Sequence, residues 1–210
     1  MKSSHWREEI DFEPDQKTPM GIVKNVAHEM KKRGFSDVLE IGCGQGRNAA
    51  WLAGKGFSVT GVDFLMRDLL KFKIYAKKKG ISPYIVQNDI SHLSFKENQF
   101  DVVMSLHVLT FVTEDTRSLV LQEVKRVLRP RGLLVAVERS PKDPDYRKGV
   151  EVERETYSFR GFTHHFFSEH ELRELLSPME VVVLRDMRTI DTTHDSPHVH
   201  GVWVAVAVNK

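Results

Sequence analysis

Short apolar runs alternate with longer amphipathic stretches along most of the chain. Continuous apolar runs are typical of strands buried on both faces, whereas apolar residues three or four apart indicate helices. We expect strands over residues 38–41, 58–62, 84–88, 100–104, 133–138, 180–185 and 201–208, and helices over residues 21–32, 46–55, 65–79, 115–128 and 169–176. This alternation predicts an α/β fold, in which helices cover a largely parallel sheet.

Several helix boundaries carry their own signals. A glycine follows three of the helices, as is common just past a helix end: Gly34, Gly56 and Gly80. Ser168 followed by Glu171 forms a capping box, which predicts the start of the last helix. These signals agree with the boundaries drawn from the apolar pattern.

Two segments depart from the alternation. Residues 139–167 are charged, aromatic and rich in turn residues. Because so long a connection inside a compact domain is usually functional, we expect a lid or substrate wall, with a surface excursion or small hairpin as the alternative. A mostly polar stretch of about fifteen residues, 186–200, separates the last two strands, which we therefore expect to pair as an antiparallel hairpin in a mixed sheet.

Composition limits the classes of protein that remain. The 210 residues are 40% hydrophobic and 29% charged, which suits a single folded domain and excludes a largely disordered chain. The net charge of +2 gives no reason to expect a protein that coats nucleic acid or an anionic membrane. The chain has one cysteine and no apolar run of the about 18 residues that a membrane span needs, so we expect a cytoplasmic protein. Residues 1–20 form either a flap over the site or a frayed terminus.

The sharpest signal is a glycine loop at the end of the first strand. Gly42, Gly44 and Gly46 occupy alternate positions, and a helix is expected to start at the third. Glycines let backbone amides approach a ligand, and a helix N-terminus favours an anionic group. The next strand ends at Asp63, and an acid there can accept hydrogen bonds from ribose hydroxyls. These features fit NAD or another adenosine cofactor.

The spacing of the glycines and one acidic residue distinguish between these candidate cofactors. The glycines follow Gly-x-Gly-x-Gly and not the Gly-x-Gly-x-x-Gly of a dinucleotide site, and Glu40 lies two residues before the first glycine. A carboxylate repels a pyrophosphate but attracts an amino group or a sulfonium. The sequence therefore favours S-adenosylmethionine.

Five ordered motifs now show a family resemblance. They are the loop of residues 40–46, the VTGVD run ending at Asp63, QNDI at 87–90, FDVVMS at 100–105 and LRPRGLL at 128–134. In this order they resemble class I S-adenosylmethionine-dependent methyltransferases. The resemblance implies one Rossmann-like domain over residues 1–210, with helices on both faces of a seven-stranded mixed sheet of order 3-2-1-4-5-7-6 and an antiparallel last strand. It also implies transfer of a methyl group, with S-adenosylhomocysteine as the product.

The resemblance assigns cofactor contacts to the ends of the first four strands. Asp63 is expected to bind the ribose and Phe64 to lie against the adenine, with a core position as the alternative for Phe64. Asp89 is expected to accept from the adenine amino group, with a turn cap as the alternative. The full set is Glu40, Gly42, Gly44, Gly46, Asp63, Phe64, Asp89, Ile90 and Ser105.

Signatures of macromolecular acceptors are missing. The fourth strand leads into Ser105-Leu106-His107-Val108 and not into the Asn/Asp-Pro-Pro-aromatic run of amino-methylating DNA enzymes or the Pro-Cys of cytosine-C5 enzymes. The paired-glutamate hairpin of protein arginine methyltransferases is not visible either. We therefore expect a small-molecule acceptor and neither a nucleic acid nor a membrane as partner, in a monomer or homodimer. The alternatives are an enzyme acting on tRNA or protein, and a non-catalytic S-adenosylmethionine-binding protein.

Histidines gather in the segments expected at the carboxyl edge of the sheet, where ligands bind in such folds. They are His107, His164, His165, His194, His198 and His200. One interpretation makes one or two of them a base or anion holder for the acceptor, assisted by Arg160. A second makes His194, His198 and His200 a metal site, and a third sees ordinary loop polarity. We select His107, His194 and Arg160 as catalytic candidates and expect no metal.

A narrower resemblance comes from residues 43–48, 56–59 and 109–112, which are similar to tellurite-resistance methyltransferases and their thiol- or metalloid-methylating relatives. In those enzymes a histidine and an arginine before the last strand lie near the acceptor. His194 is the nearest match here, but Asp195 stands where the arginine is expected.

Overall fold

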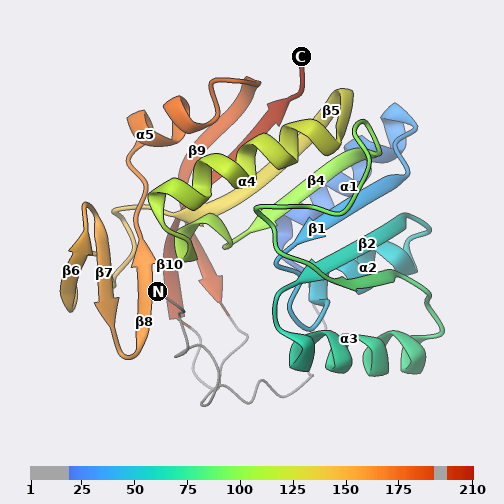
Figure 1. The fold of residues 1–210 in the computed structure, drawn as a ribbon, viewed down its shortest axis with the longest axis horizontal. Coiled ribbons are helices and arrows are strands. Elements are labelled where there is room, and N and C mark those ends of the chain that lie inside the picture. Colours follow the sequence, from blue (N-terminus) through green and yellow to red (C-terminus); the bar gives the residue numbers. More distant parts are fainter. Residues whose placement is uncertain (1–18, 192–197) are drawn as a thin grey trace.

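The computed structural model describes residues 19–191 and 198–210. Its main sheet has seven strands in the order β3-β2-β1-β4-β5-β10-β9 (Figure 1). These strands are β1 (Asp37–Ile41), β2 (Ser58–Asp63), β3 (Tyr84–Gln87), β4 (Phe100–Leu106), β5 (Leu128–Arg139), β9 (Glu180–Asp191) and β10 (His198–Val208). The predicted flap over residues 1–20 lies almost wholly outside the described residues.

The sheet is parallel except at β10, which runs antiparallel to both β5 and β9. Because β9 and β10 are the sixth and seventh strands of this sheet, the expected order 3-2-1-4-5-7-6 is confirmed. The carboxyl ends of the parallel strands therefore meet at one edge. The first residues of β10 lie at that same edge.

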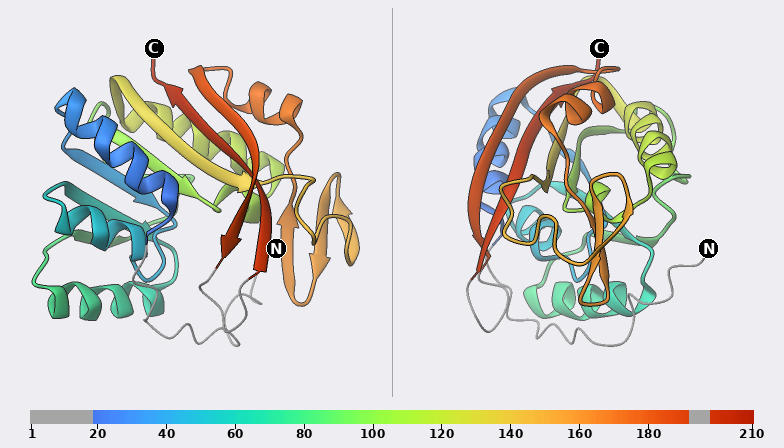
Figure 2. Two further views of the ribbon diagram at one scale, coloured as in Figure 1. Left: turned by 180° about the vertical axis from the view of Figure 1, so that it is seen from behind. Right: turned by 90° about the vertical axis from the view of Figure 1, so that its left-hand side faces the viewer.

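Helices cover both faces of the sheet (Figures 1 and 2). One face packs against α1 (Gly21–Arg33), α2 (Arg47–Gly54) and α3 (Met66–Lys79), and the other against α4 (Glu114–Val127), α5 (Glu169–Leu175) and the 3-10 turn η1 (Leu109–Phe111). The burial of neighbouring residues of β4 shows why both faces of the sheet are covered. Val102 and Met104 are buried under the first set of helices, whereas Val103 is buried under α4. This alternation is the period of two that a strand imposes.

The predicted helix caps are present. Gly34 and Gly80 adopt left-handed backbone angles, with φ of +71° and +64°, directly after α1 and α3. The backbone N–H of Glu171 donates to Ser168 Oγ at 3.2 Å, which completes the expected cap of α5. No helix in the described ranges is both long enough and apolar enough to span a membrane.

Three strand boundaries were predicted wrongly. Strand β5 starts at Leu128, directly after α4, because it pairs with Phe100 there and then shifts register before Val102. Strands β9 and β10 extend through most of residues 186–200, which we expected to be a loop. Antiparallel backbone pairing satisfies these N–H and C=O groups whatever the polarity of the side chains. His200 therefore lies in a strand, opposite Thr189.

The segment of residues 139–167 forms a second, three-stranded antiparallel sheet. Its strands are β6 (Val150–Glu153), β7 (Thr156–Phe159) and β8 (Phe162–His165). Figures 1 and 2 show it standing apart from the main sheet, at the end where β9 and β10 lie. Its two ends meet, because Phe167 N–H donates to Arg139 O at 2.9 Å. A role as lid or substrate wall stays a prediction.

Candidate active site

The glycine loop follows β1 and depends on glycine for two different reasons. All three glycines have positive φ: +62° at Gly42, +52° at Gly44 and +82° at Gly46. A Cβ at Gly42 would lie 2.6 Å from Val108 Cγ2, and one at Gly46 would overlap the Phe72 ring. At Gly44 a Cβ would meet nothing within 4 Å. Packing therefore requires the outer two glycines, whereas the middle one faces open space.

Asp63 joins this loop to the end of β2. Its Oδ2 accepts the backbone N–H of Gly44 at 2.9 Å, and its Oδ1 accepts the N–H of Leu65 at 2.8 Å. Burial raises the pKa of Asp63, although these two hydrogen bonds oppose the shift. The carboxylate thus lies beside the open space at Gly44, as expected for a group that binds a ribose.

Glu40 lies beneath the loop and is almost fully buried. Its Oε1 accepts a hydrogen bond from Asn48 Nδ2 at 3.0 Å, but its Oε2 has no hydrogen-bond partner among the described residues. Burial raises the pKa of Glu40 to about 7. A buried carboxyl oxygen with nothing to accept from is costly, and a cationic ligand would satisfy it. The residues therefore fit the ammonium-bearing end of S-adenosylmethionine.

A cavity of about 360 Å³ adjoins the end of β2, lined by Phe64, Leu65, Met66, Arg67 and Gln87. The Phe64 side chain is 60% exposed, so the alternative of a core position is wrong. Gln87 Nε2 donates to Phe64 O at 2.9 Å and links β3 to this wall. An exposed aromatic ring beside a cavity suits a planar base such as adenine.

Asp89 and Ile90 follow β3. Asp89 Oδ1 accepts both the N–H of Ser91 at 2.8 Å and its hydroxyl at 2.7 Å, so this acid does cap a turn. Its side chain is nevertheless exposed, and Ile90 is half-buried against the core under α4. Capping and a contact with adenine are compatible, because a carboxylate has several acceptor sites.

Comparisons with known proteins point to the same family. The methyltransferase domain family matches residues 39–136. The uncharacterised methyltransferase YodH of Bacillus subtilis is 35% identical over 126 residues, covering 60% of this chain and 52% of its own. The ubiquinone biosynthesis O-methyltransferase of Rickettsia conorii is 33% identical over 99 residues, covering 47% of this chain and 33% of its own. The chain thus spans about half the length, or less, of these curated relatives.

A solved S-adenosylmethionine-dependent methyltransferase from Methanosarcina mazei superposes with a TM-score of 0.77 at 26% identity, over 91% of this chain and 98% of that one. Residues 39–136 thus match the methyltransferase domain family, and the fold over most of the chain is that of an S-adenosylmethionine-dependent methyltransferase. TehB from Haemophilus influenzae also superposes, with a TM-score of 0.71 at 19% identity, over 91% of this chain and 63% of TehB. That likeness shows the shared fold, so the finer part of the tellurite-type resemblance stays a prediction.

The predicted acceptor side starts at the turn after β4. His107, the first residue of the turn, has a φ of +60° and donates its N–H to Val137 O at 2.7 Å. A left-handed residue other than glycine costs about 1–2 kcal/mol, and such strain often marks functional positions. The next residue, Val108, packs against Gly42. His107 therefore lies directly beside the glycine loop.

Glu138, near the end of β5, holds this turn in place. Its Oε1 accepts from Ser105 Oγ at 3.1 Å and from Leu109 N at 3.2 Å, and its Oε2 accepts from Thr110 N at 2.9 Å. Burial raises the pKa of Glu138 to about 7. Ser105 was predicted at the cofactor, but its buried hydroxyl is used here. Glu138 was not predicted from the sequence, although an acid at the end of an apolar strand was the available signal.

Three of the predicted rim histidines lie near one another. The rings of His107 and His200 are 6.3 Å apart, and Nδ1 of His200 lies 2.9 Å from Asp143 Oδ2. The His164 ring lies 5.0 Å from that of Phe111. Burial, together with the nearby charge of Arg139, lowers the pKa of His164 to about 4, so its imidazole is neutral.

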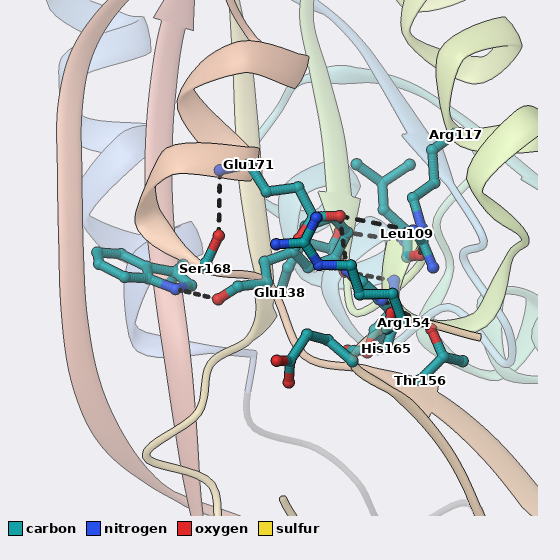
Figure 3. Close-up of polar contacts among 12 residues, drawn as sticks. Leu109, Arg117, Glu138, Arg154, Thr156, His165, Ser168 and Glu171 are labelled. Atoms are coloured by element: carbon teal, nitrogen blue, oxygen red, sulfur yellow. Dashed lines mark hydrogen bonds and ion pairs between the residues drawn. The ribbon is translucent and has the colours of Figure 1, made fainter. Parts of the chain in front are cut away.

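His165 turns away from this group into the protein interior. Its Nδ1 lies 2.8 Å from Thr156 Oγ1, and its Nε2 lies 2.8 Å from Glu171 Oε1 (Figure 3). The hydroxyl of Thr110 donates to the backbone carbonyl of His165 at 2.6 Å. Buried Arg117 adds a bond from Nε to Leu109 O at 3.3 Å. This network ties the small sheet, α5 and η1 together, so His165 is structural.

Of the other two catalytic candidates, the structure describes only Arg160. Arg160 is exposed at the turn between β7 and β8, with its guanidinium 4.9 Å from the Phe159 ring. His194 lies outside the described residues, as does the side chain of His198. Within the part of the chain that the structure describes, no three histidine, cysteine or acidic side chains form a group suited to a metal.

Proposed function

We propose that the chain transfers a methyl group from S-adenosylmethionine to a small-molecule acceptor by in-line displacement. One observation carries the cofactor assignment: the unpartnered, buried Oε2 of Glu40 lies beneath a glycine loop whose middle residue faces open space. A pyrophosphate would place negative charge beside that acid, whereas an ammonium group would satisfy it.

Residues of the glycine loop and of the end of the second strand each bind a different part of S-adenosylmethionine. Glu40 attracts the charged amino-acid end, Asp63 accepts from the ribose hydroxyls and Phe64 packs against the adenine. Gly42 and Gly46 keep the loop in its open shape, and Asp89 and Ile90 complete the adenine side. When bound, S-adenosylmethionine supplies a methyl group on a positively charged sulfur. The chain's own task is then to align the acceptor and exclude water.

The acceptor side supports a small molecule. The turn held by Glu138 places His107 beside the glycine loop, where an acceptor has to approach. The small sheet of β6–β8 stands at the end of the main sheet where β9 and β10 lie, and in the predicted role of lid or substrate wall it would favour a compact acceptor over a long polymer. The relative from Rickettsia conorii is named for ubiquinone biosynthesis, a small-molecule pathway. Contacts from Arg160 and His194, a cytoplasmic location and a monomeric or homodimeric state remain predictions.

Calorimetric titration with S-adenosylmethionine tests the cofactor assignment. We expect Asp63→Ala to weaken binding by about 1–3 kcal/mol, because the ribose hydroxyls lose their acceptor. Asp63→Asn retains one acceptor oxygen and should lose less. Asp115→Ala, at an exposed acid of α4, is the matched control and should bind normally. Unchanged affinity in Asp63→Ala, or tight binding of NAD by the wild-type protein, would contradict the assignment.

A further inference from the structure

Asp143 and His200 form a buried pair that our sequence analysis did not connect. They lie 57 residues apart in the sequence, Asp143 in the segment after β5 and His200 near the start of β10. Asp143 is only 4% exposed and His200 only 8%, and Nδ1 of the imidazole lies 2.9 Å from Oδ2 of the carboxyl. A carboxyl group placed this way fixes both the rotation and the tautomer of an imidazole ring.

The surroundings keep Asp143 ionised. Burial alone would raise the pKa of Asp143, but the hydrogen bond with His200 and the guanidinium of Arg139 outweigh it and lower that pKa. Oδ1 lies 3.1 Å from Arg139 Nη1 and accepts the N–H of Asp145 at 2.9 Å. An ionised carboxylate can only accept, so the proton of the neutral imidazole lies on Nδ1. The lone pair of His200 is therefore on Nε2.

The pair lies at the acceptor edge of the sheet. Because β10 runs antiparallel to β5, Val202 pairs with Arg139 at the last residue of β5, and His200 lies beyond that end. The ring of His107 is 6.3 Å from that of His200, and the residue after His107 packs against Gly42. The two histidine rings thus connect the pair to the turn beside the glycine loop.

We propose that His200 is the general base of the reaction and that Asp143 is its positioning residue. This inference rests on the proposed function. Nε2 takes the proton from an acceptor O–H or S–H group, and a lone pair of that oxygen or sulfur forms the bond to the methyl carbon. The carbon–sulfur bond of the sulfonium breaks, and its electron pair stays on the sulfur. The sulfur thereby becomes neutral, and the positive charge is now carried by the protonated imidazole of His200.

This assignment predicts the chemistry of the acceptor. A histidine base is useful for a group that is protonated near neutral pH yet only weakly acidic, such as a phenol, an enol or a thiol. Among the described residues, the titratable and charged groups around His200 include Asp143 and Arg139 from the end of β5 and the segment after it, His107 from the turn after β4, and His164 from β8. Any pH profile has to be assigned to one of these groups by spectroscopy.

Nuclear magnetic resonance of ¹⁵N-labelled histidine tests the pair without turnover. Loss of a signal in His200→Gln identifies the His200 resonances. We expect the wild-type ring to carry its proton on Nδ1. In Asp143→Asn this preference should vanish, because the amide no longer presents two equivalent acceptor oxygens to the ring. A wild-type ring with its proton on Nε2 would overturn the proposal.

A series of ring-substituted phenols and thiophenols of graded acidity tests catalysis, with S-adenosylhomocysteine as the measured product. We expect His200→Gln to lower kcat by about 10²–10⁴-fold for acceptors that are protonated at the assay pH, and far less for those already ionised. His170→Gln, at an exposed histidine of α5, is the matched control. An equal loss across the series, or none, would overturn the proposal, because a structural role affects all acceptors alike.

Two failures are distinguishable. If the wild-type protein binds S-adenosylmethionine but methylates none of these phenols and thiophenols, the general-base proposal fails while the cofactor assignment stands. If it does not bind S-adenosylmethionine, the proposed function itself fails. Should Asp143→Asn not fold, His200→Gln and His200→Asn still measure the contribution of the base, with folding checked by thermal unfolding.

Discussion

Glu138 accepts the backbone N–H of Thr110 at 2.9 Å and thereby ties the end of β5 to the turn after β4. The same carboxyl accepts from Leu109 N and Ser105 Oγ. One buried acid thus replaces the hydrogen bonds that a regular element would give these groups. The geometry of the acceptor side depends on it.

Glu138→Ala should therefore destabilise the fold. Two backbone donors and one hydroxyl lose their acceptor in the interior, and we expect the free energy of unfolding to fall by about 2–4 kcal/mol. Urea unfolding measures this change. Glu153→Ala, at an exposed acid of β6, should change the free energy by less than about 0.5 kcal/mol. A similarly small effect of Glu138→Ala would show that the turn does not need this anchor.

Binding of S-adenosylmethionine should depend on pH through Glu40. Its pKa is raised to about 7 by burial, and a bound cation stabilises the ionised form and lowers that pKa. Binding below pH 7 therefore releases a proton, so affinity should rise from pH 6 to about pH 7 and level off above it. Calorimetry in two buffers of different ionisation enthalpy measures the proton release.

Glu40→Gln should bind more weakly and lose this pH dependence. Adenosine, which lacks the ammonium and sulfonium groups, provides the control and should bind without releasing a proton at any pH. Proton uptake on binding of S-adenosylmethionine, or the same release with adenosine, would contradict the role of Glu40.

Gly44→Ala should separate binding from stability. Gly44 and Gly34 both have positive φ and open space where a Cβ would lie, so alanine at either position should cost about 1 kcal/mol of stability. Only the Cβ at residue 44 enters the space assigned to the cofactor. We expect Gly44→Ala to lose about tenfold in affinity for S-adenosylmethionine, or about 1.4 kcal/mol, while Gly34→Ala binds normally. Equal affinities would place the ligand elsewhere.

Phe64→Ala should weaken cofactor binding with little effect on folding. The ring is 60% exposed beside the cavity, so its loss removes contact with the adenine and leaves the core intact. We expect binding weaker by about 1–2 kcal/mol and stability unchanged within about 0.5 kcal/mol. Tyr84→Ala removes an equally exposed ring that does not line this cavity and should leave affinity unchanged. Calorimetry measures the affinity of the two variants for S-adenosylmethionine, and thermal unfolding measures their stability.

The sequence was informative where local patterns decide the structure. The apolar periods located the strands and helices of the main sheet, because each strand or helix buries a face set by its own repeat. The glycine loop and Asp63 were found because a backbone turn and a strand end depend on nearby residues. Glu40 stood out because it lies two residues before the first glycine, where a carboxylate would repel a pyrophosphate.

Long-range pairing could not be predicted in this way. His164 and His165 are neighbours in a strand and so point to opposite sides, but the segment has no apolar alternation that says which one is buried. The contact between Asp143 and His200 depends on how far β10 extends past β5, and the polar arms of β9 and β10 gave no strand pattern. Backbone pairing between strands determines which of the two histidines is buried and where His200 lies. The side chains of these segments do not encode that pairing.

The hydrogen bond from Phe167 N–H to Arg139 O brings together the two places where the chain leaves the main domain for the small sheet of β6–β8 and returns from it. No residue assigned to the cofactor lies in it. Exchange of this one contiguous stretch of chain can therefore change the substrate range of such an enzyme. The residues assigned to S-adenosylmethionine lie outside the stretch and stay unchanged.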